Sequence, residues 1–200
     1  IIQKIACVGI GYICGLFSPA LLIGRVRGKD IRKHGSGNLG SPHALRTLGW
    51  GAGVLSFIGD IGKAVFAFLI LHFLIFQELD LSMVVLYAGL GLTLGHNFPV
   101  HLKFRGGKGI AVLLTIVIAF DWRIAIIPFV VFVFLVFITK FVSLGSLLAS
   151  AIVFMQMLIL PLFDVDMGPH YAETTIILGI LVCLAWFMHR ENLKRLVKGE

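Results

Sequence analysis

Long apolar runs recur along the whole chain and are separated by short polar segments. Five of them have about the length that a helix needs to cross a hydrocarbon core of ~30 Å. They cover residues 5–23, 50–76, 81–100, 144–163 and 171–188. A sixth apolar stretch, 110–139, is interrupted by "DWR" at 121–123, which we interpret as a tight turn between two short helices. The pattern predicts an all-α, polytopic membrane protein with about seven transmembrane helices.

Composition supports a membrane protein. The 200 residues are 58% hydrophobic and only 14% charged, and the mean hydropathy is +1.01, so the chain is far more apolar than an ordinary soluble domain. No internal repeat, low-complexity tract or second domain is visible, and we expect a single domain over residues 1–200. The first residue is Ile and no leader with a cleavage site precedes the first run, so a cleaved signal is not expected.

The basic residues are distributed unevenly between alternate loops. Fourteen of the seventeen Lys and Arg residues lie in segments 24–49, 101–109, 140 and 189–200. The other loops hold six of the ten acidic residues and one Arg. Because cytoplasmic loops collect Lys and Arg, this bias predicts an external N-terminus, a cytoplasmic C-terminus and an odd number of crossings. It also accounts for the net charge of +7 without a nucleic-acid partner.

Three polar clusters fall on the predicted cytoplasmic side. They read "HGSGNLGSPHALR" from residue 34, "GHNFPVHLKFRGGKG" from residue 95 and "HRENLKRL" from residue 189. Glycine lets backbone N–H groups approach an anion closely, and Arg46, Lys108 and Arg190 would add positive charge suited to phosphate. Other loop cations, such as Arg25, Arg27 and Lys103, need no role beyond setting the topology.

Several familiar sites are not supported by these segments. "GSGNLG" fits the G-x-G-x-x-G pattern, but a basic segment and not a strand precedes it, so a dinucleotide site is not indicated. Lys108 is followed by Gly109 and not by Ser or Thr, unlike a nucleotide P-loop. None of the seven histidines has an Asp five residues later, the spacing found in many glycerolipid acyltransferases. The three cysteines lie inside apolar runs, and no metal or cofactor is expected.

A few polar residues near or inside the predicted spans can be interpreted in two ways, as structural or as functional residues. His96 and His189 end apolar helices, where a histidine commonly caps carbonyl groups. Asp60 and Lys63 share one face of the second span, as a structural ion pair or as functional groups. Ser146 lies near a helix start, where bonding back to a helical carbonyl is a sufficient explanation.

Taken together, the three clusters resemble the bacterial acyl-phosphate:glycerol-3-phosphate acyltransferases, and the similarity runs along nearly the whole chain. The resemblance implies an integral membrane enzyme that acylates glycerol 3-phosphate to lysophosphatidic acid, with an acyl phosphate as donor and no metal. It also implies a bacterial plasma (inner) membrane location, a cytoplasmic active site, contact with membrane lipid, and a functional link to the enzyme that supplies acyl phosphate. The resemblance assigns catalytic roles to Ser36, Lys108 and His189. It assigns substrate binding to Gly37, Asn38, Arg46, His96, Asn97, Gly106, Gly107, Gly109, Ser146, Arg190 and Asn192.

The chain departs from the family pattern in the first cluster. Where the family usually continues Gly-Ala-Thr-Asn, this sequence has Gly40-Ser41-Pro42-His43. Pro42 removes a backbone donor and His43 replaces an amide side chain. These departures leave open an inactive family member. A second alternative, which does not depend on them, is a membrane transporter for a small phosphorylated solute that uses the same basic loops. The identity of the general base is also open, between His189 and an oxygen of the acyl phosphate.

Overall fold

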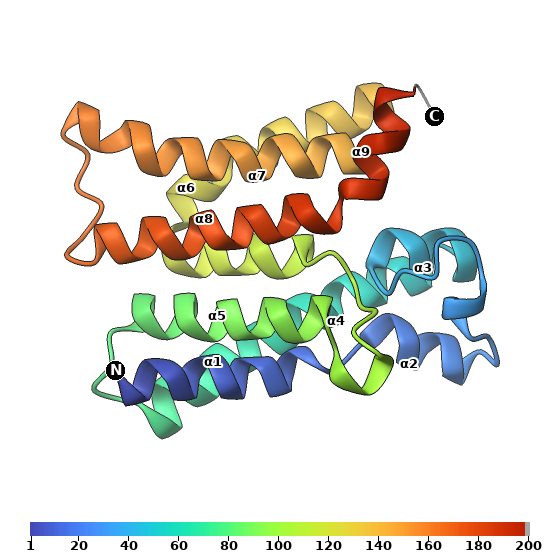
Figure 1. Cartoon of the computed structure of the whole chain (residues 1–200), viewed down its shortest axis with the longest axis horizontal. Coiled ribbons are helices and arrows are strands. Elements are labelled where there is room, and N and C mark those ends of the chain that lie inside the picture. The colour runs from blue at the N-terminus through green and yellow to red at the C-terminus, as the bar shows by residue number, and fades with distance from the viewer. Residues whose placement is uncertain (199–200) are drawn as a thin grey trace. The chain divides into compact units, whose positions relative to one another are not determined.

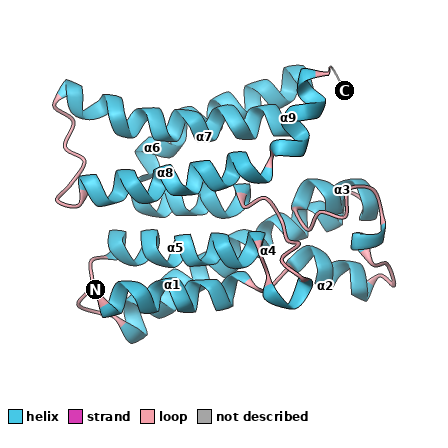
Figure 2. Cartoon of the chain, in the orientation of Figure 1, coloured by secondary structure: helices cyan, strands magenta, loops and turns pink. Residues whose placement is uncertain are grey.

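The computed structural model describes residues 1–198, and this part of the chain consists of helices joined by loops (Figures 1 and 2). It packs as two compact units that divide between Ile116 and Val117. Six helical stretches of the described chain are long and apolar enough to cross a membrane. The predicted all-helical, polytopic architecture is therefore confirmed. The count of seven crossings and the single domain stay predictions.

The first unit begins with two helices where the sequence suggested one run. α1 (Ile2–Gly15) and α2 (Pro19–Val26) are separated by a break at residues 16–18. Pro19 has no N–H to continue α1 and its fixed φ suits the first position of a new helix, while the Ser18 hydroxyl accepts a long hydrogen bond from Leu21 N at 3.4 Å. Residues 5–23 therefore form two helices and not a continuous one, although together they remain a candidate span.

Glycines bring two helices of the first unit into backbone contact. α1 lies beside α5 (Leu81–Asn97), as Figure 1 shows. Gly11 and Gly15 of α1 face the backbone at Ala88 and Leu92, and Gly91 faces Val8 of α1. Each helix carries two glycines four residues apart, the spacing that lets membrane helices approach most closely. This packing makes α5 well buried, with 67% of its span inside the protein.

The remaining elements of the first unit position the polar loops. α4 (Trp50–Ile70) continues into the π-helical turn η2 (Leu71–Ile75). Two short 3₁₀ turns, η1 (Ile31–Lys33) and η3 (Val100–Leu102), and the helix α3 (Ser41–Leu48) belong to the loop regions. A small apolar cluster anchors these short elements to α2. It consists of Ala20, Leu21, Ile31, Leu39, Ala44 and Leu102.

The second unit contains the remaining spans. α6 (Ile110–Thr139) starts in the first unit and is broken at Asp121, whose backbone (φ −156°, ψ 106°) is not helical. α7 (Val142–Ile159), the 3₁₀ turn η4 (Leu160–Phe163), α8 (Tyr171–Met188) and α9 (Arg190–Val197) follow. Hydrogen bonds from Trp186 Nε1 to Ser150 Oγ (3.2 Å) and from the Tyr171 hydroxyl to the Met157 carbonyl (2.8 Å) join α8 to α7. The break at Asp121 coincides with the turn predicted at "DWR".

Candidate active site

The first polar loop, residues 27–40, is shaped by a local ion pair and by glycine. The Asp30 carboxylate accepts hydrogen bonds from Arg32 N (3.1 Å), Nε (2.9 Å) and an η nitrogen (2.7 Å). These bonds to the guanidinium hold the pKa of Asp30 well below its usual value. Gly35 and Gly37 adopt positive φ values of 49° and 66°, which turn the chain so that Ser36 is exposed between them.

The two departures from the family pattern fit this loop without strain. Gly40 caps α3, so Pro42 lies in its first turn, where a backbone N–H is not needed. His43 is buried, and its Nε2 donates to the Ile31 carbonyl at 3.1 Å. Its Nδ1 is therefore the acceptor for the Ser36 hydroxyl, at the long distance of 3.5 Å. His43 thus ties Ser36 to the 3₁₀ turn before it.

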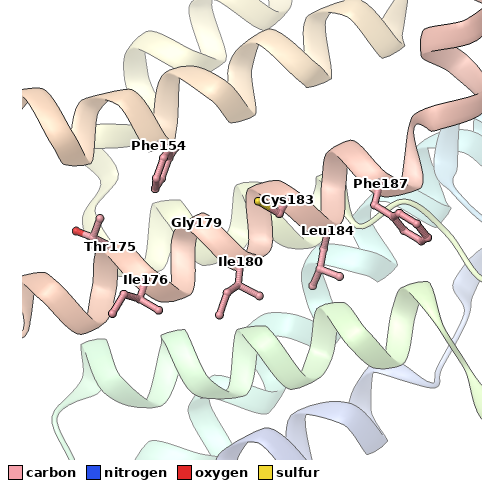
Figure 3. A pocket seen from close by; sticks show the side chains of 8 residues that line it. All are labelled: Phe154, Thr175, Ile176, Gly179, Ile180, Cys183, Leu184 and Phe187. Carbon is pink, nitrogen blue, oxygen red and sulfur yellow. The ribbon is translucent and has the colours of Figure 1, made fainter.

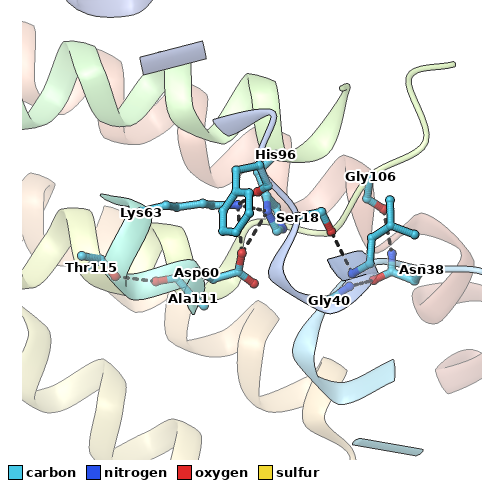
Figure 4. A network of polar contacts seen from close by, with 11 residues as sticks. Ser18, Asn38, Gly40, Asp60, Lys63, His96, Gly106, Ala111 and Thr115 are labelled. Atoms are coloured by element: carbon cyan, nitrogen blue, oxygen red, sulfur yellow. Dashed lines mark hydrogen bonds and ion pairs between the residues drawn. The ribbon is translucent and has the colours of Figure 1, made fainter. Parts of the chain in front are cut away.

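Asn38 connects the first polar loop to the second. Its Oδ1 accepts from Gly40 N at 2.8 Å, and its Nδ2 donates to the Gly106 carbonyl at 3.4 Å (Figure 4). The second of these bonds joins segments that lie 68 residues apart in the sequence. The structure therefore brings Asn38 of the first polar cluster next to the "RGGKG" segment of the second.

The second polar segment turns back onto the end of α5. Gly106 N donates to the Asn97 carbonyl at 3.1 Å, and Gly107 N donates to the His96 carbonyl at 3.0 Å. A Cβ atom at residue 107 would overlap His96 Nε2, so only glycine fits there. Gly109 has a φ of +75° and lies against the Asn97 amide. Lys108 is thus held between three glycines at the start of α6.

Asn97 is completely buried, and neither atom of its side-chain amide has a hydrogen-bond partner among the described residues. The Thr93 hydroxyl, one turn earlier on α5, is also buried and unpartnered within that part of the chain. Buried polar groups are normally satisfied, so these atoms mark a polar spot beside Gly109. Arg46, by contrast, is exposed in the last turn of α3.

His96 also meets two charged residues of α4. Its Nδ1 lies 2.8 Å from Lys63 Nζ and 3.5 Å from Asp60 Oδ1, and all three side chains are at most 5% exposed. The sequence suggested a pairing of Asp60 with Lys63 from their spacing, and the 2.8 Å ion pair confirms it. Their contact with His96, on a helix more than thirty residues away, was not predicted.

The other candidate residues belong to the second unit. Ser146 is buried near the start of α7, and its hydroxyl donates to the Val142 carbonyl at 2.8 Å, as back-bonding predicts. His189 is buried between α8 and α9, and its Nδ1 donates to the Ala185 carbonyl at 2.7 Å. A neutral His189 therefore carries its lone pair on Nε2.

Arg190 and Asn192 lie on α9, which the sequence analysis did not predict as a helix. The Arg190 guanidinium lies 4.5 Å from the centre of the Phe187 ring and donates to the Phe187 carbonyl at 3.1 Å. Asn192 is half-buried. The structure thus gathers Ser36, Gly37, Asn38, His96, Asn97, Gly106, Gly107, Lys108 and Gly109 in the first unit. Ser146, His189, Arg190 and Asn192 belong to the second unit.

An apolar groove runs along α8 in the second unit (Figure 3). Its volume is about 570 Å³. It extends from Thr175 to Phe187, with Phe154 of α7 at one side. Gly179 lies close under the Phe154 ring, so the floor of the groove is a helix backbone at this point. The groove ends at Phe187, the residue whose ring and carbonyl contact Arg190.

Comparison with known proteins agrees with this geometry. A family model described as glycerol-3-phosphate acyltransferase matches residues 5–199. A glycerol-3-phosphate acyltransferase of Alkaliphilus metalliredigens is 38% identical over 94% of this chain and 89% of its own. A glycerol-3-phosphate acyltransferase of Thermus thermophilus is 34% identical over 95% of this chain and 89% of its own.

A solved structure is also similar: PlsY (YgiH), described as an integral membrane glycerol 3-phosphate acyltransferase. In its glycerol 3-phosphate form it matches with a TM-score of 0.82 and 29% identity, over 98% of this chain and 92% of that one. Its lysophosphatidic acid form matches with a TM-score of 0.79. The chain belongs to the glycerol-3-phosphate acyltransferase family.

Family membership makes this chain an integral membrane acyltransferase, which confirms the resemblance carried by the three polar clusters. The transporter alternative is set aside. The role of each candidate residue stays a prediction.

Proposed function

We propose that this acyltransferase moves a fatty acyl group from an acyl phosphate to glycerol 3-phosphate. The primary hydroxyl attacks the acyl carbonyl carbon, the bond from that carbon to the phosphate oxygen breaks, and lysophosphatidic acid and phosphate leave. The observation that carries this proposal is the placement of Lys108 among three glycines beside Asn38 and Asn97. Such a glycine-rich, cationic turn is suited to a phosphate group.

The residues of the two units would act mainly by binding and positioning. Two anionic substrates repel each other, and Lys108, Arg46 and Arg190 would offset that repulsion. Lys108 and Gly109 would contact the phosphate, and Ser36, exposed between two glycines, would contact the reacting groups. Gly37, Gly106 and Gly107 would shape the turns around it, because their N–H groups already donate to the His34, Asn97 and His96 carbonyls. Ser146 and Asn192 would line the site in the second unit.

The hydroxyl proton has two possible acceptors. His189 is suited to accept it at Nε2, because its Nδ1–H is already committed to the Ala185 carbonyl. Alternatively, an oxygen of the acyl phosphate takes the proton and leaves with it as part of the phosphate product. An acyl phosphate is a mixed anhydride with a good leaving group, so either acceptor suffices.

The acyl chain would lie in the apolar groove along α8 (Figure 3). The groove ends at Phe187, just before His189 and Arg190. If the acyl chain lies in this groove, the phosphate of the acyl phosphate would lie near His189 and Arg190. Because the chain would enter this groove from lipid and not from water, van der Waals packing against the groove would hold it.

We place the enzyme in a bacterial plasma membrane with seven crossings and the polar loops on the cytoplasmic side. The break at Asp121 supports the seventh crossing, because the backbone there is not helical and the charges of Asp121 and Arg123 would be costly inside the hydrocarbon core. The basic loops face the cytoplasm under the positive-inside rule. Acyl phosphate would come from a cytoplasmic or membrane-bound enzyme that makes this mixed anhydride.

The deciding experiment is an assay of the purified full chain in detergent. Labelled glycerol 3-phosphate and a long-chain acyl phosphate should give labelled lysophosphatidic acid and phosphate, and a metal chelator should leave the rate unchanged. Acyl-coenzyme A should give no product. Turnover with acyl-coenzyme A but not with acyl phosphate would overturn the proposed donor, and no product with either would contradict the proposed reaction.

A further inference from the structure

A buried ionic cluster lies next to the phosphate-binding segment, and its two charged residues have no role in the reaction described above. Asp60 and Lys63 of α4 meet His96 of α5, and the side chains are 2%, 5% and 5% exposed (Figure 4). A buried ion pair is costly to desolvate, and an apolar pair of similar size is often as stable or more so. Stability alone therefore gives little reason for Asp60 and Lys63 to be charged.

The Lys63 ammonium has three partners within this cluster: an ion pair with Asp60 and hydrogen-bond contacts with a carbonyl and with His96. Nζ lies 2.8 Å from Asp60 Oδ1, 2.9 Å from the Phe17 carbonyl and 2.8 Å from His96 Nδ1. The Phe17 carbonyl is available because the chain breaks between α1 and α2 at this point. Asp60 supplies the compensating charge, so the ammonium is held in one place.

This arrangement fixes the tautomer of His96. An ammonium group can only donate, so His96 Nδ1 accepts from the charged Lys63 at 2.8 Å, the nearer of its two partners, since Asp60 Oδ1 lies at 3.5 Å. The imidazole is therefore neutral, with its single proton on Nε2. In an isolated histidine the proton distributes between the two nitrogens, so the cluster selects one of two states.

The proton on Nε2 points at the glycine-rich segment. Gly107 packs directly against Nε2, and the Gly107 N–H is bonded to the His96 carbonyl at 3.0 Å. Among the described residues no protein group accepts a hydrogen bond from Nε2. His96 thus presents an N–H donor beside Lys108, where a phosphate would be held.

We propose that Asp60 and Lys63 are positioning residues that hold His96 as its Nε2–H tautomer, so that His96 donates a hydrogen bond to a substrate phosphate. This rests on the proposed function, in which the segment 106–109 binds phosphate. The phosphate belongs to either glycerol 3-phosphate or the acyl phosphate, and the two are distinguished by their separate KM values.

The kinetic test replaces the two charged residues of the cluster, Asp60 and Lys63, together. Asp60→Leu with Lys63→Met leaves no unpaired charge and no donor to Nδ1, and its apolar side chains should be accepted in the membrane interior. The KM for one of the two phosphate substrates should rise about 10- to 100-fold, the loss expected for one hydrogen bond to a charged group, while kcat changes much less. An unchanged KM for both substrates in the folded variant would overturn the proposal.

A double-mutant cycle separates positioning from packing. His96→Phe should raise the same KM by a similar factor, and adding Asp60→Leu with Lys63→Met to it should cost little more, because both changes remove one hydrogen bond. Additive losses would contradict an effect that passes through His96. Ser56→Ala, at a buried position one turn away on α4, is the matched control and should leave both KM values unchanged.

The tautomer itself is measured by ¹⁵N NMR of histidine-labelled full-length protein, with the His96 signals assigned by their loss in His96→Phe. The wild-type spectrum should show an unprotonated Nδ1 and a protonated Nε2, and the Asp60→Leu, Lys63→Met variant should show a mixture. A protonated Nδ1 in the wild type would overturn the proposal. Because this measurement needs no turnover, it decides the positioning role even if the wild-type protein makes no lysophosphatidic acid, which would contradict the proposed function alone.

Discussion

Lys108 is the residue on which the phosphate-binding proposal depends most directly. It follows Gly106 and Gly107 and precedes Gly109, whose positive φ turns the chain into α6. Lys108→Ala should lower kcat/KM by about 2–5 kcal/mol, the cost of truncating one partner of a buried charge pair. The folded yield should change little, because the backbone bonds of Gly106 and Gly107 remain.

The matched control for Lys108 is Lys103→Ala in the same loop. Lys103 is exposed after η3 and has no proposed contact with substrate. Steady-state rates of both variants, measured with glycerol 3-phosphate and acyl phosphate, give the comparison. Full activity of Lys108→Ala would assign "GGKG" a purely structural role.

His43 should matter for the stability of the first loop. His43→Ala leaves the Ile31 carbonyl without its 3.1 Å partner, and an unsatisfied buried group of this kind costs about 1–3 kcal/mol. Pro42→Thr should change the free energy of unfolding by less than about 0.5 kcal/mol, because no N–H is used at the second position of α3. Thermal unfolding in detergent measures both.

The same two positions decide whether the chain is a decayed enzyme. Because Pro42 and His43 fit the loop, restoring the usual family residues by Pro42→Thr with His43→Asn should raise kcat/KM by no more than a few-fold. A large gain of activity in this variant would favour an inactive family member, contrary to our proposal.

At the scale of helices, the contact of α1 with α5 provides a sharp comparison. A Cβ atom at Gly11 would overlap the Ala88 carbonyl, whereas one at Gly9, on the exposed side of the same helix, would meet nothing within 4 Å. Gly11→Ala should therefore destabilise the protein by about 1–3 kcal/mol, as overpacking does. Gly9→Ala should be neutral or slightly stabilising, since alanine favours a helix. Equal melting temperatures for the two variants would contradict this packing.

The sequence predicted helices better than it predicted their contacts. Apolar runs located the spans, and α8 has the predicted bounds, Tyr171–Met188. The break before Pro19 was missed because an uncharged run gives no sign of an interruption, although proline at a helix start is a recognisable signal. Periodicity describes one helix at a time, so neither the partner of α1 nor the meeting of Asp60 with His96 could be inferred from spacing.

The site was predictable where its residues are close in sequence. Gly106 to Gly109 and the turn around Ser36 and Gly37 follow from local glycine patterns, and the structure places both in one unit. The hydrogen bond from Asn38 to Gly106, across 68 residues, depends on tertiary packing and was not predicted. The distribution of Lys and Arg placed the two loops only on the same face of the membrane.

For the whole molecule, the topology depends on the break in α6. The segment before Asp121 has eleven residues, about 16 Å of helix at 1.5 Å per residue, which is short for a ~30 Å core. If α6 crosses once, residues 103 and 140 lie on opposite sides of the membrane. If the chain reverses at Asp121, they lie on the same side. Their basic character, and the acidic residues of the loops near 80 and 166, favour the second arrangement.

Reporter fusions distinguish the two topologies. Fusions after Lys29, Lys103 and Lys140 should read cytoplasmic, and fusions near Asp80, Asp121 and Asp166 should read external. The Lys103 and Lys140 fusions form the decisive pair, because they lie on either side of α6. They give the same reading only if the chain reverses direction at Asp121. Opposite readings from this pair would leave six crossings and place the "RGGKG" loop and the C-terminal cluster on different sides. Lys108 and His189 could then not act on the same substrate molecules, so this measurement tests their proposed roles as well as the number of spans.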